Sequence, residues 1–293
     1  MTSLLALMAC NKDEEVTIDT PDDPQQTASE FNVMEYMPAP GQFINEKASG
    51  FIDITTMQEA CEYAEKRFAT GNYVSLGAWG GYIVVKSRSP IANSGNYDFS
   101  IFGNAFDTSN EPGIVWVMTD TNSNGLPDDE WYELRGSDYG KEGYEKDYWV
   151  TYYRPIGDQA DIAWTDSNDE SGFIYRNIYH KQSSYFPTWA EGSSYTLHGS
   201  RLPARIIETS EGIWSNKPFE WGYADNDGED SRIQKFNGKI VQENFFRISD
   251  AVDGEGKAVN LDHIDFIKVQ TAINANTLVT GENSTEVCGF SRL

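Results

Sequence analysis

The chain has 293 residues and a formal net charge of −24, from 22 basic and 46 acidic residues. This acidic balance argues against nucleic acids and anionic lipid surfaces as partners, because both would be repelled. A hydrophobic content of 39% and an aromatic content of 13% provide a large core, in one all-β domain or two small ones.

The N-terminus carries a targeting pattern. Residues 4–8 (LLALM) are apolar but too few to span a bilayer. They lead into the sequence LMAC, which looks like a bacterial lipobox with Cys10 as the lipidated residue. The acidic residues 11–15 (NKDEE) resemble the tag that directs Bacteroidetes lipoproteins to the cell surface. No Lys or Arg precedes the apolar run, which departs from the usual signal.

We therefore predict a lipid-anchored protein of the outer membrane, exposed on the cell surface. Residues 1–9 are expected to be a signal-peptide remnant, residues 10–30 a lipidated acidic tether, and residues 31–293 a single β-sandwich ligand-binding domain. The alternative is a frayed apolar terminus with an accidental cysteine. In the lipoprotein interpretation, the membrane is contacted only through the lipid anchor.

One helix is predicted, over residues 56–69. Thr56 and Glu59 form a capping-box pattern, and Gly71 supplies a stop signal. Apolar residues recur on one face at helical spacing, namely Met57, Ala60, Cys61, Ala64 and Phe68. We expect this helix to pack against a sheet.

The rest of the chain has the pattern of short strands separated by turns. Strands are predicted at residues 73–77, 82–86, 98–103, 114–118, 147–153, 264–271 and 284–290. The fold class is therefore all-β, a jelly-roll-like β-sandwich with one or a few short helices. Residues 155–240 are rich in aromatic and turn residues and are predicted to form long loops, where binding sites usually lie.

The sharpest local motif is residues 120–130 (DTNSNGLPDDE), which follow the layout of a calcium-binding loop. The motif predicts one structural calcium held by Asp120, Asn122, Asn124 and Asp128 and by the carbonyl of Leu126. Trp131 occupies the position of the usual bidentate acid, so a turn that caps its own backbone is the alternative. A second acidic turn, residues 225–230 (DNDGED), leaves the same two interpretations open.

The sequence carries no recognisable motif for catalysis or zinc binding. Cys61 and Cys288 have no metal-binding spacing, and two separate buried thiols are favoured over a disulfide. The sequence contains no nucleophile elbow, P-loop, dinucleotide fingerprint or zinc motif. We therefore predict no catalytic residues, although paired carboxylates cannot be recognised from sequence alone.

Several segments together resemble a family of Bacteroidetes cell-surface lipoproteins. They are residues 36–45 (YMPAPGQFIN), 75–83 (SLGAWGGYI), 97–106 (YDFSIFGNAF), 120–132, 221–225 (WGYAD) and 284–287 (STEV). The resemblance covers residues 36–290 and implies a jelly-roll-like domain without established catalysis. It also implies genes placed beside TonB-dependent transporters, some of them in cobalamin-uptake loci.

The leading hypothesis is a non-catalytic lipoprotein that captures a corrinoid (cobalamin) and passes it to a TonB-dependent transporter. The alternatives are a glycan-binding module of a polysaccharide-utilisation system and a surface glycan hydrolase. The predicted ligand contacts are Trp79, Trp131, Trp164, Tyr185, Trp189 and Tyr223. The competing interpretation is that these rings fill the core.

Overall fold

The structure is a computed structural model that describes residues 30–210, 213–277 and 281–293. The predicted signal remnant, most of the predicted tether and Cys10 lie outside the described residues. Among the described residues, no helix is both long enough and apolar enough to cross a membrane.

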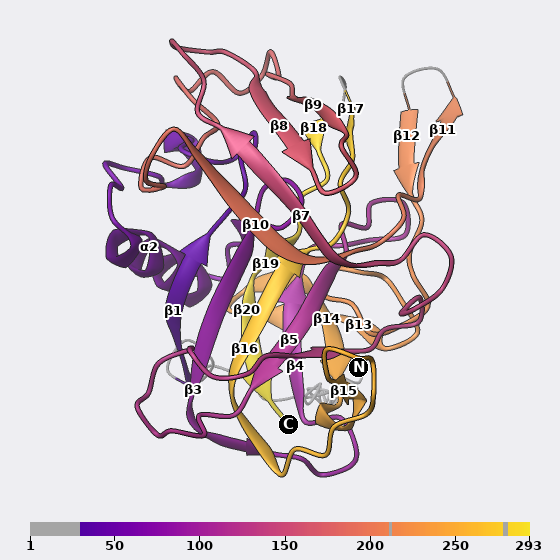
Figure 1. The fold of residues 1–293 in the computed structure, drawn as a ribbon. Helices are drawn as coiled ribbons and strands as arrows, with labels where there is room; N and C mark the ends of the chain where they lie inside the picture. The colour runs from indigo at the N-terminus through magenta and orange to yellow at the C-terminus, as the bar shows by residue number, and fades with distance from the viewer. Residues whose placement is uncertain (1–29, 211–212, 278–280) are drawn as a thin grey trace, which may run out of the picture.

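The largest sheet has six antiparallel strands (Figure 1). Their order is β1 (Phe31–Met37), β3 (Tyr82–Ala92), β16 (His263–Thr271), β5 (Gly113–Met118), β6 (Tyr132–Leu134) and β15 (Ala251–Val252). β16 pairs with both β3 and β5, so a C-terminal strand lies at the centre of the sheet. Its register places Val269 beside Ile83 on one side and Val115 on the other, and all three are buried.

A second antiparallel sheet packs against the first. Its order is β13 (Ser231–Phe236), β14 (Lys239–Phe246), β4 (Phe99–Gly103) and β20 (Gly289–Arg292). The central core contains Val85 and Ile267 from the large sheet together with Ile101 and Phe290 from the second. Burying both inner faces in one core is the arrangement of a β-sandwich. The predicted all-β sandwich is therefore confirmed.

A third antiparallel sheet covers one end of the sandwich (Figure 1). Its order is β10 (Ser194–Arg201), β7 (Glu145–Tyr153), β8 (Ile162–Asp166) and β9 (Ser171–Ile174). The smaller elements are β2 (Val74–Ser75) with β19 (Glu286–Val287), β11 (Ile206–Ser210) with β12 (Ile213–Asn216), β17 (Asn276–Thr277) with β18 (Gly281–Glu282), and the 3-10 turns η1 (Lys47–Ser49) and η2 (Ile248–Asp250).

Residues 155–240 differ from their prediction as long loops. Strands β8 to β13 all lie within this segment. Several of these strands are largely exposed, as in β9 and β11. In both strands the large apolar residues are adjacent, Phe173–Ile174 and Ile206–Ile207, so the apolar alternation that marks a half-buried strand is missing from their sequence.

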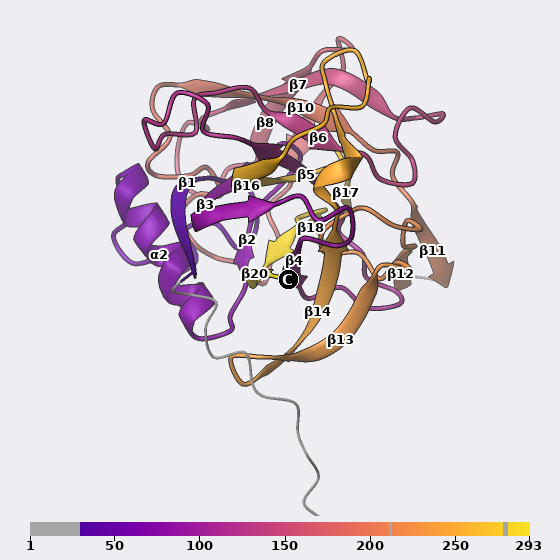
Figure 2. The ribbon, with the colours of Figure 1, turned by 90° about the horizontal axis from the view of Figure 1, so that it is seen from below.

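The helix predicted from sequence is present as α2 (Met57–Ala69) and begins where the sequence predicts. The Thr56 side chain accepts a hydrogen bond from the Glu59 amide, and the Glu59 carboxylate accepts one from the Thr56 amide. The helix lies alongside β1 (Figure 2) and buries Cys61 and Phe68 in the central core. Cys61 and Cys288 are both buried and free, as predicted.

Candidate functional site

A cavity of about 380 Å³ lies among segments that are far apart in the sequence. It is lined by the β4–β5 connection, the β11–β12 hairpin, the segment from β18 to β19 and the residues that follow β1. Aromatic and amide groups in its walls come from Phe43, Tyr73, Phe106, Asn104, Asn216 and Asn283. This volume falls in the lower part of the range typical of small-molecule sites.

The Asp225 carboxylate connects its own segment to two others by hydrogen bonds, at one side of this cavity. Its Oδ1 accepts hydrogen bonds from the amides of Asn104 (2.9 Å) and Ala105 (2.8 Å), and its Oδ2 accepts one from the amide of Glu286 (2.9 Å). Gly103 permits this close approach, because a Cβ there would lie 2.7 Å from the Asp225 Oδ1. The segments GNAF, WGYAD and STEV, which contribute to the family resemblance, therefore meet at one carboxylate.

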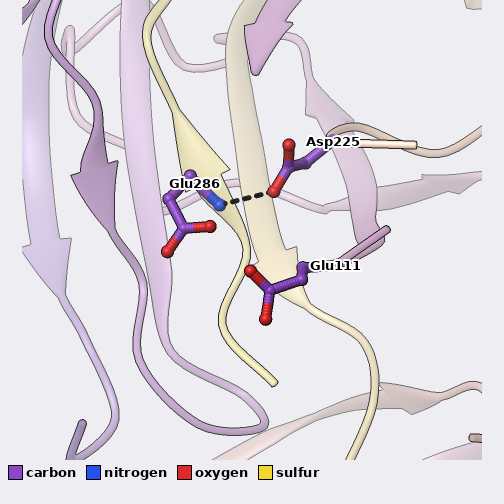
Figure 3. Close-up of side chains that lie close together, drawn as sticks. All are labelled: Glu111, Asp225 and Glu286. Carbon is purple, nitrogen blue, oxygen red and sulfur yellow. Dashed lines mark hydrogen bonds between the residues drawn. The ribbon is translucent and has the colours of Figure 1, made fainter. Parts of the chain in front are cut away.

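Two glutamates complete an acidic cluster, which we define as Glu111, Asp225 and Glu286 (Figure 3). One carboxylate oxygen from each residue lies within 4.8 Å of the other two. Glu111 is half-buried, and its Oε1 accepts a hydrogen bond of 3.0 Å from the Ser284 amide. Glu286 is 3% exposed, and its Oε1 has no hydrogen-bond partner in the part of the chain that the structure describes. Glu286 thus brings an unpaired carboxylate oxygen to a site that already holds two other acids.

The electrostatics of the cavity are dominated by burial. Desolvation raises the pKa of Glu111 and Glu286, and the neighbouring carboxylates raise that of Glu286 further. Burial also raises the pKa of Glu282, another acid in the cavity wall, to about 8. Across the described ranges, none of these acids forms an ion pair with Lys, Arg or His. The cavity therefore favours a bound positive charge or bound protons.

A second cavity, of about 250 Å³, differs from the first in the charges around its buried acid. It lies beside Trp221, and its buried acid Asp230 accepts a hydrogen bond of 2.7 Å from the Gly222 amide. The nearby positive charge of Arg247 counteracts part of the rise that burial causes in the pKa of Asp230. Because this acid has a cationic neighbour, we take the first cavity as the candidate site.

The predicted calcium ligands Asp120, Asn122, Asn124, Leu126 and Asp128 lie together in one largely exposed turn. Asp120 accepts hydrogen bonds from the amides of Asn124 (3.1 Å) and Gly125 (2.9 Å), and it lies 3.5 Å from the Lys86 ammonium. The Asn124 side-chain amide donates to Asp128. These contacts are those of a self-capping turn, the alternative interpretation of the motif. Calcium in this turn stays a prediction.

The six predicted ligand-contacting aromatics do not form one surface. Trp79, Tyr185, Trp189 and Tyr223 are each at most 6% exposed and are divided among three core clusters. Trp131 and Trp164 are half-buried and pack against two different clusters. None of the six lines the acidic cavity. Their packing accounts for these rings, and their role as ligand contacts stays a prediction.

Sequence reasoning missed most of the acidic cluster. Asp225 belongs to the second acidic turn, but Glu111 and Glu286 lie in no local motif and come from distant segments. The signal that could have found it is the joint appearance of GNAF, WGYAD and STEV among the segments that carry the family resemblance. Searches against family models and against curated proteins find no match for the chain.

One further buried acid, Glu133, is fully paired. It accepts hydrogen bonds from the hydroxyls of Tyr144 (2.9 Å) and Ser200 (2.6 Å). Burial raises its pKa from an ordinary 4.5 to about 7, although these bonds and the charges of Lys146 and Lys268 oppose the rise. The folded state therefore holds this proton more tightly than the unfolded chain does.

We expect Glu133 to make stability decline as the pH rises. Protonated Glu133 stabilises the folded state relative to the ionised form, and this contribution is fully present below about pH 4.5. It is lost as the pH rises to about 7, which lowers the free energy of unfolding by about 3 kcal/mol. Urea unfolding of the protein and of Glu133→Gln at pH 5 and pH 8 measures this difference. The other acids contribute equally to the pH dependence of both proteins, so their contributions cancel in the comparison. An identical pH dependence of the two proteins would rule out the effect of Glu133.

Proposed function

We propose that the chain is a non-catalytic ligand-capture protein whose ligand is held in the acidic cavity. The observation that carries this proposal is the convergence of aromatic, amide and carboxylate groups in one hollow. A few polar groups placed among apolar ones in a concave site is the usual composition of a binding pocket. The walls come from connections between strands, which is where a β scaffold usually places its ligand contacts.

The proposed setting is the outer face of the outer membrane. The LMAC motif followed by NKDEE supports a lipid anchor at Cys10 and export to the cell surface. A protein tethered there can collect a nutrient and present it to a TonB-dependent transporter. This part of the proposal depends on the sequence pattern and the family resemblance.

A corrinoid is the proposed ligand. Its periphery is rich in amide groups, which pair with side-chain amides such as those of Asn104, Asn216 and Asn283. A whole corrinoid is too large for a cavity of about 380 Å³, so one of its arms would enter while the ring rests at the mouth. Phe106, which lines the cavity and is 58% exposed, offers a ring for this contact.

A glycan is the second candidate ligand. Sugar rings stack on aromatic side chains and hydrogen-bond to carboxylates and amides, and the cavity offers all three kinds of group. Glycan hydrolysis is less well supported by the geometry. A hydrolase needs two carboxyl groups that flank the scissile bond, about 5 Å or more apart. The Glu111 and Glu286 carboxylates instead belong to one tight cluster, with an oxygen of each within 4.8 Å of the other.

Isothermal titration calorimetry tests this proposal. The full chain carrying Cys10→Ala, so that no lipid is attached, is titrated with cyanocobalamin and with a panel of glycans. Phe106→Ala should weaken binding by about tenfold or more, because it removes an aromatic contact, and should leave the melting temperature unchanged.

The matched control is Ile240→Ala. This residue is also exposed, at 83%, but it lies on β14 away from the cavity lining. It should bind ligand like the parent protein. Heat with glycans alone would select the second candidate, and no heat with any ligand would refute capture of either kind.

A further inference from the structure

The acidic cluster has the spacing of a cation site. Calcium binds oxygen ligands at about 2.3–2.6 Å, so two ligand oxygens on one ion are at most about 5 Å apart. The three oxygens of Glu111, Asp225 and Glu286 all lie within 4.8 Å of one another. Figure 3 shows the three carboxyl groups turned toward one another from three separate segments. One ion can therefore touch all three.

Unpartnered oxygens beside the cluster provide a second, independent observation. Glu282 is 3% exposed and lines the same cavity, and its Oε2 has no hydrogen-bond partner among the described residues. The Oδ1 of Asn283, equally buried in the same wall, also lacks a partner. Buried polar oxygens are normally paired, because leaving one unpaired costs free energy. Their accumulation in one wall indicates that a ligand supplies the missing partner.

The local charge also requires compensation. Glu111, Glu282 and Glu286 in the cavity wall and Asp225 beside them would bring four negative charges together. No basic side chain of the described residues pairs with them. Buried charges without a partner are strongly unfavourable. A hard cation that prefers oxygen ligands neutralises such a set, and calcium tolerates an irregular arrangement better than magnesium does.

We infer that Glu111, Asp225 and Glu286 bind one calcium ion at the side of the cavity. The ion would fasten the β4–β5 connection and β19 to the segment around Asp225. Waters or ligand oxygens entering the cavity would complete its coordination, since calcium takes six to eight oxygens. The inference does not depend on which organic ligand the cavity holds. The competing occupant is a proton shared between Glu111 and Glu286.

Calcium chloride alone is the probe. The full chain carrying Cys10→Ala is treated with chelator, dialysed and titrated by isothermal calorimetry. We expect one site with a dissociation constant at or below about 1 mM. Glu111→Gln and Glu286→Gln should each weaken binding by about tenfold or more, because each removes a charged ligand. Asp128→Asn tests whether calcium binds in the turn predicted from sequence instead. Glu62→Gln, at an exposed acid on α2, is the control and should bind calcium like the parent.

Thermal unfolding gives a second measurement, which distinguishes a variant that has lost a calcium ligand from one that has lost its fold. Calcium at a hundredfold excess over its dissociation constant should shift the unfolding equilibrium of the parent by about a hundredfold. Glu286→Gln should melt no lower than the parent in chelator and should not respond to calcium. Loss of binding in Asp128→Asn instead would move the site to the turn. Absence of a calcium response in the parent would overturn the inference in favour of the shared proton.

Discussion

Replacing Trp79 by alanine should lower the free energy of unfolding by about 3–5 kcal/mol. The indole is fully buried and packs edge-on against Tyr148, with their ring centroids 4.6 Å apart. Its Nε1 also donates a hydrogen bond to the backbone carbonyl of Ser200 (3.3 Å). Truncation leaves a cavity that the surrounding sheet cannot close and an acceptor without its donor. Urea unfolding monitored by circular dichroism measures the loss.

The control for this substitution is Trp221→Ala. Trp221 is 36% exposed. Its hydrogen bond with the Ser137 amide is accepted by its backbone carbonyl, so truncating the side chain leaves that bond in place. A cost of about 1 kcal/mol is expected there. Trp79 was a predicted ligand contact from sequence, so ligand titration of both variants separates the two roles. Loss of affinity in Trp79→Ala at unchanged stability would contradict the packing role.

Gly77→Ala should destabilise the protein by a similar amount, about 3–5 kcal/mol. The backbone of Gly77 has φ +70°, a left-handed conformation that disfavours a side chain. A Cβ at this position would also lie 2.0 Å from the carbonyl oxygen of Ala39. The strand connections on both sides are buried, so neither can move aside. The change in unfolding midpoint at constant denaturant slope measures the cost.

Gly95→Ala isolates the conformational part of this effect. Gly95 has nearly the same backbone angle, φ +77°, but a Cβ there meets no atom within 4 Å. Its substitution should cost about 1–2 kcal/mol, the penalty of the left-handed conformation alone. Equal losses at Gly77 and Gly95 would mean that the predicted clash with Ala39 is relieved by a small backbone shift.

The parts of the fold that sequence predicted are those with local signals. The helix over residues 57–69 has its cap and its apolar face within fourteen residues, and both are present in the structure. β5 is a largely β-branched and aromatic run, and β16 alternates apolar and polar residues over most of its length. The exposed strands β9 and β11 lack this signal and were predicted as loops. Their pairing comes from tertiary contacts that periodicity does not record.

The candidate site was less accessible to sequence reasoning. Glu111, Asp225 and Glu286 become neighbours only when the β4–β5 connection and β19 meet at the Asp225 carboxylate. No spacing rule links residues brought together in this way. Conversely, Trp79 and Tyr223 carry the chemistry of a binding surface, yet they are buried. Aromatic side chains serve cores and sites alike, so composition alone does not separate the two uses.

A crystal structure grown with cyanocobalamin tests the central claim, that the ligand is held at the acidic cavity, most directly. The anomalous signal of the cobalt atom locates the corrin ring independently of the protein density. We predict a cobalt peak at the mouth of the cavity, beside Phe106, with a corrinoid arm reaching toward Asn104 and Asn283. A cobalt peak on another face of the sandwich, with the cavity unaltered, would contradict the account.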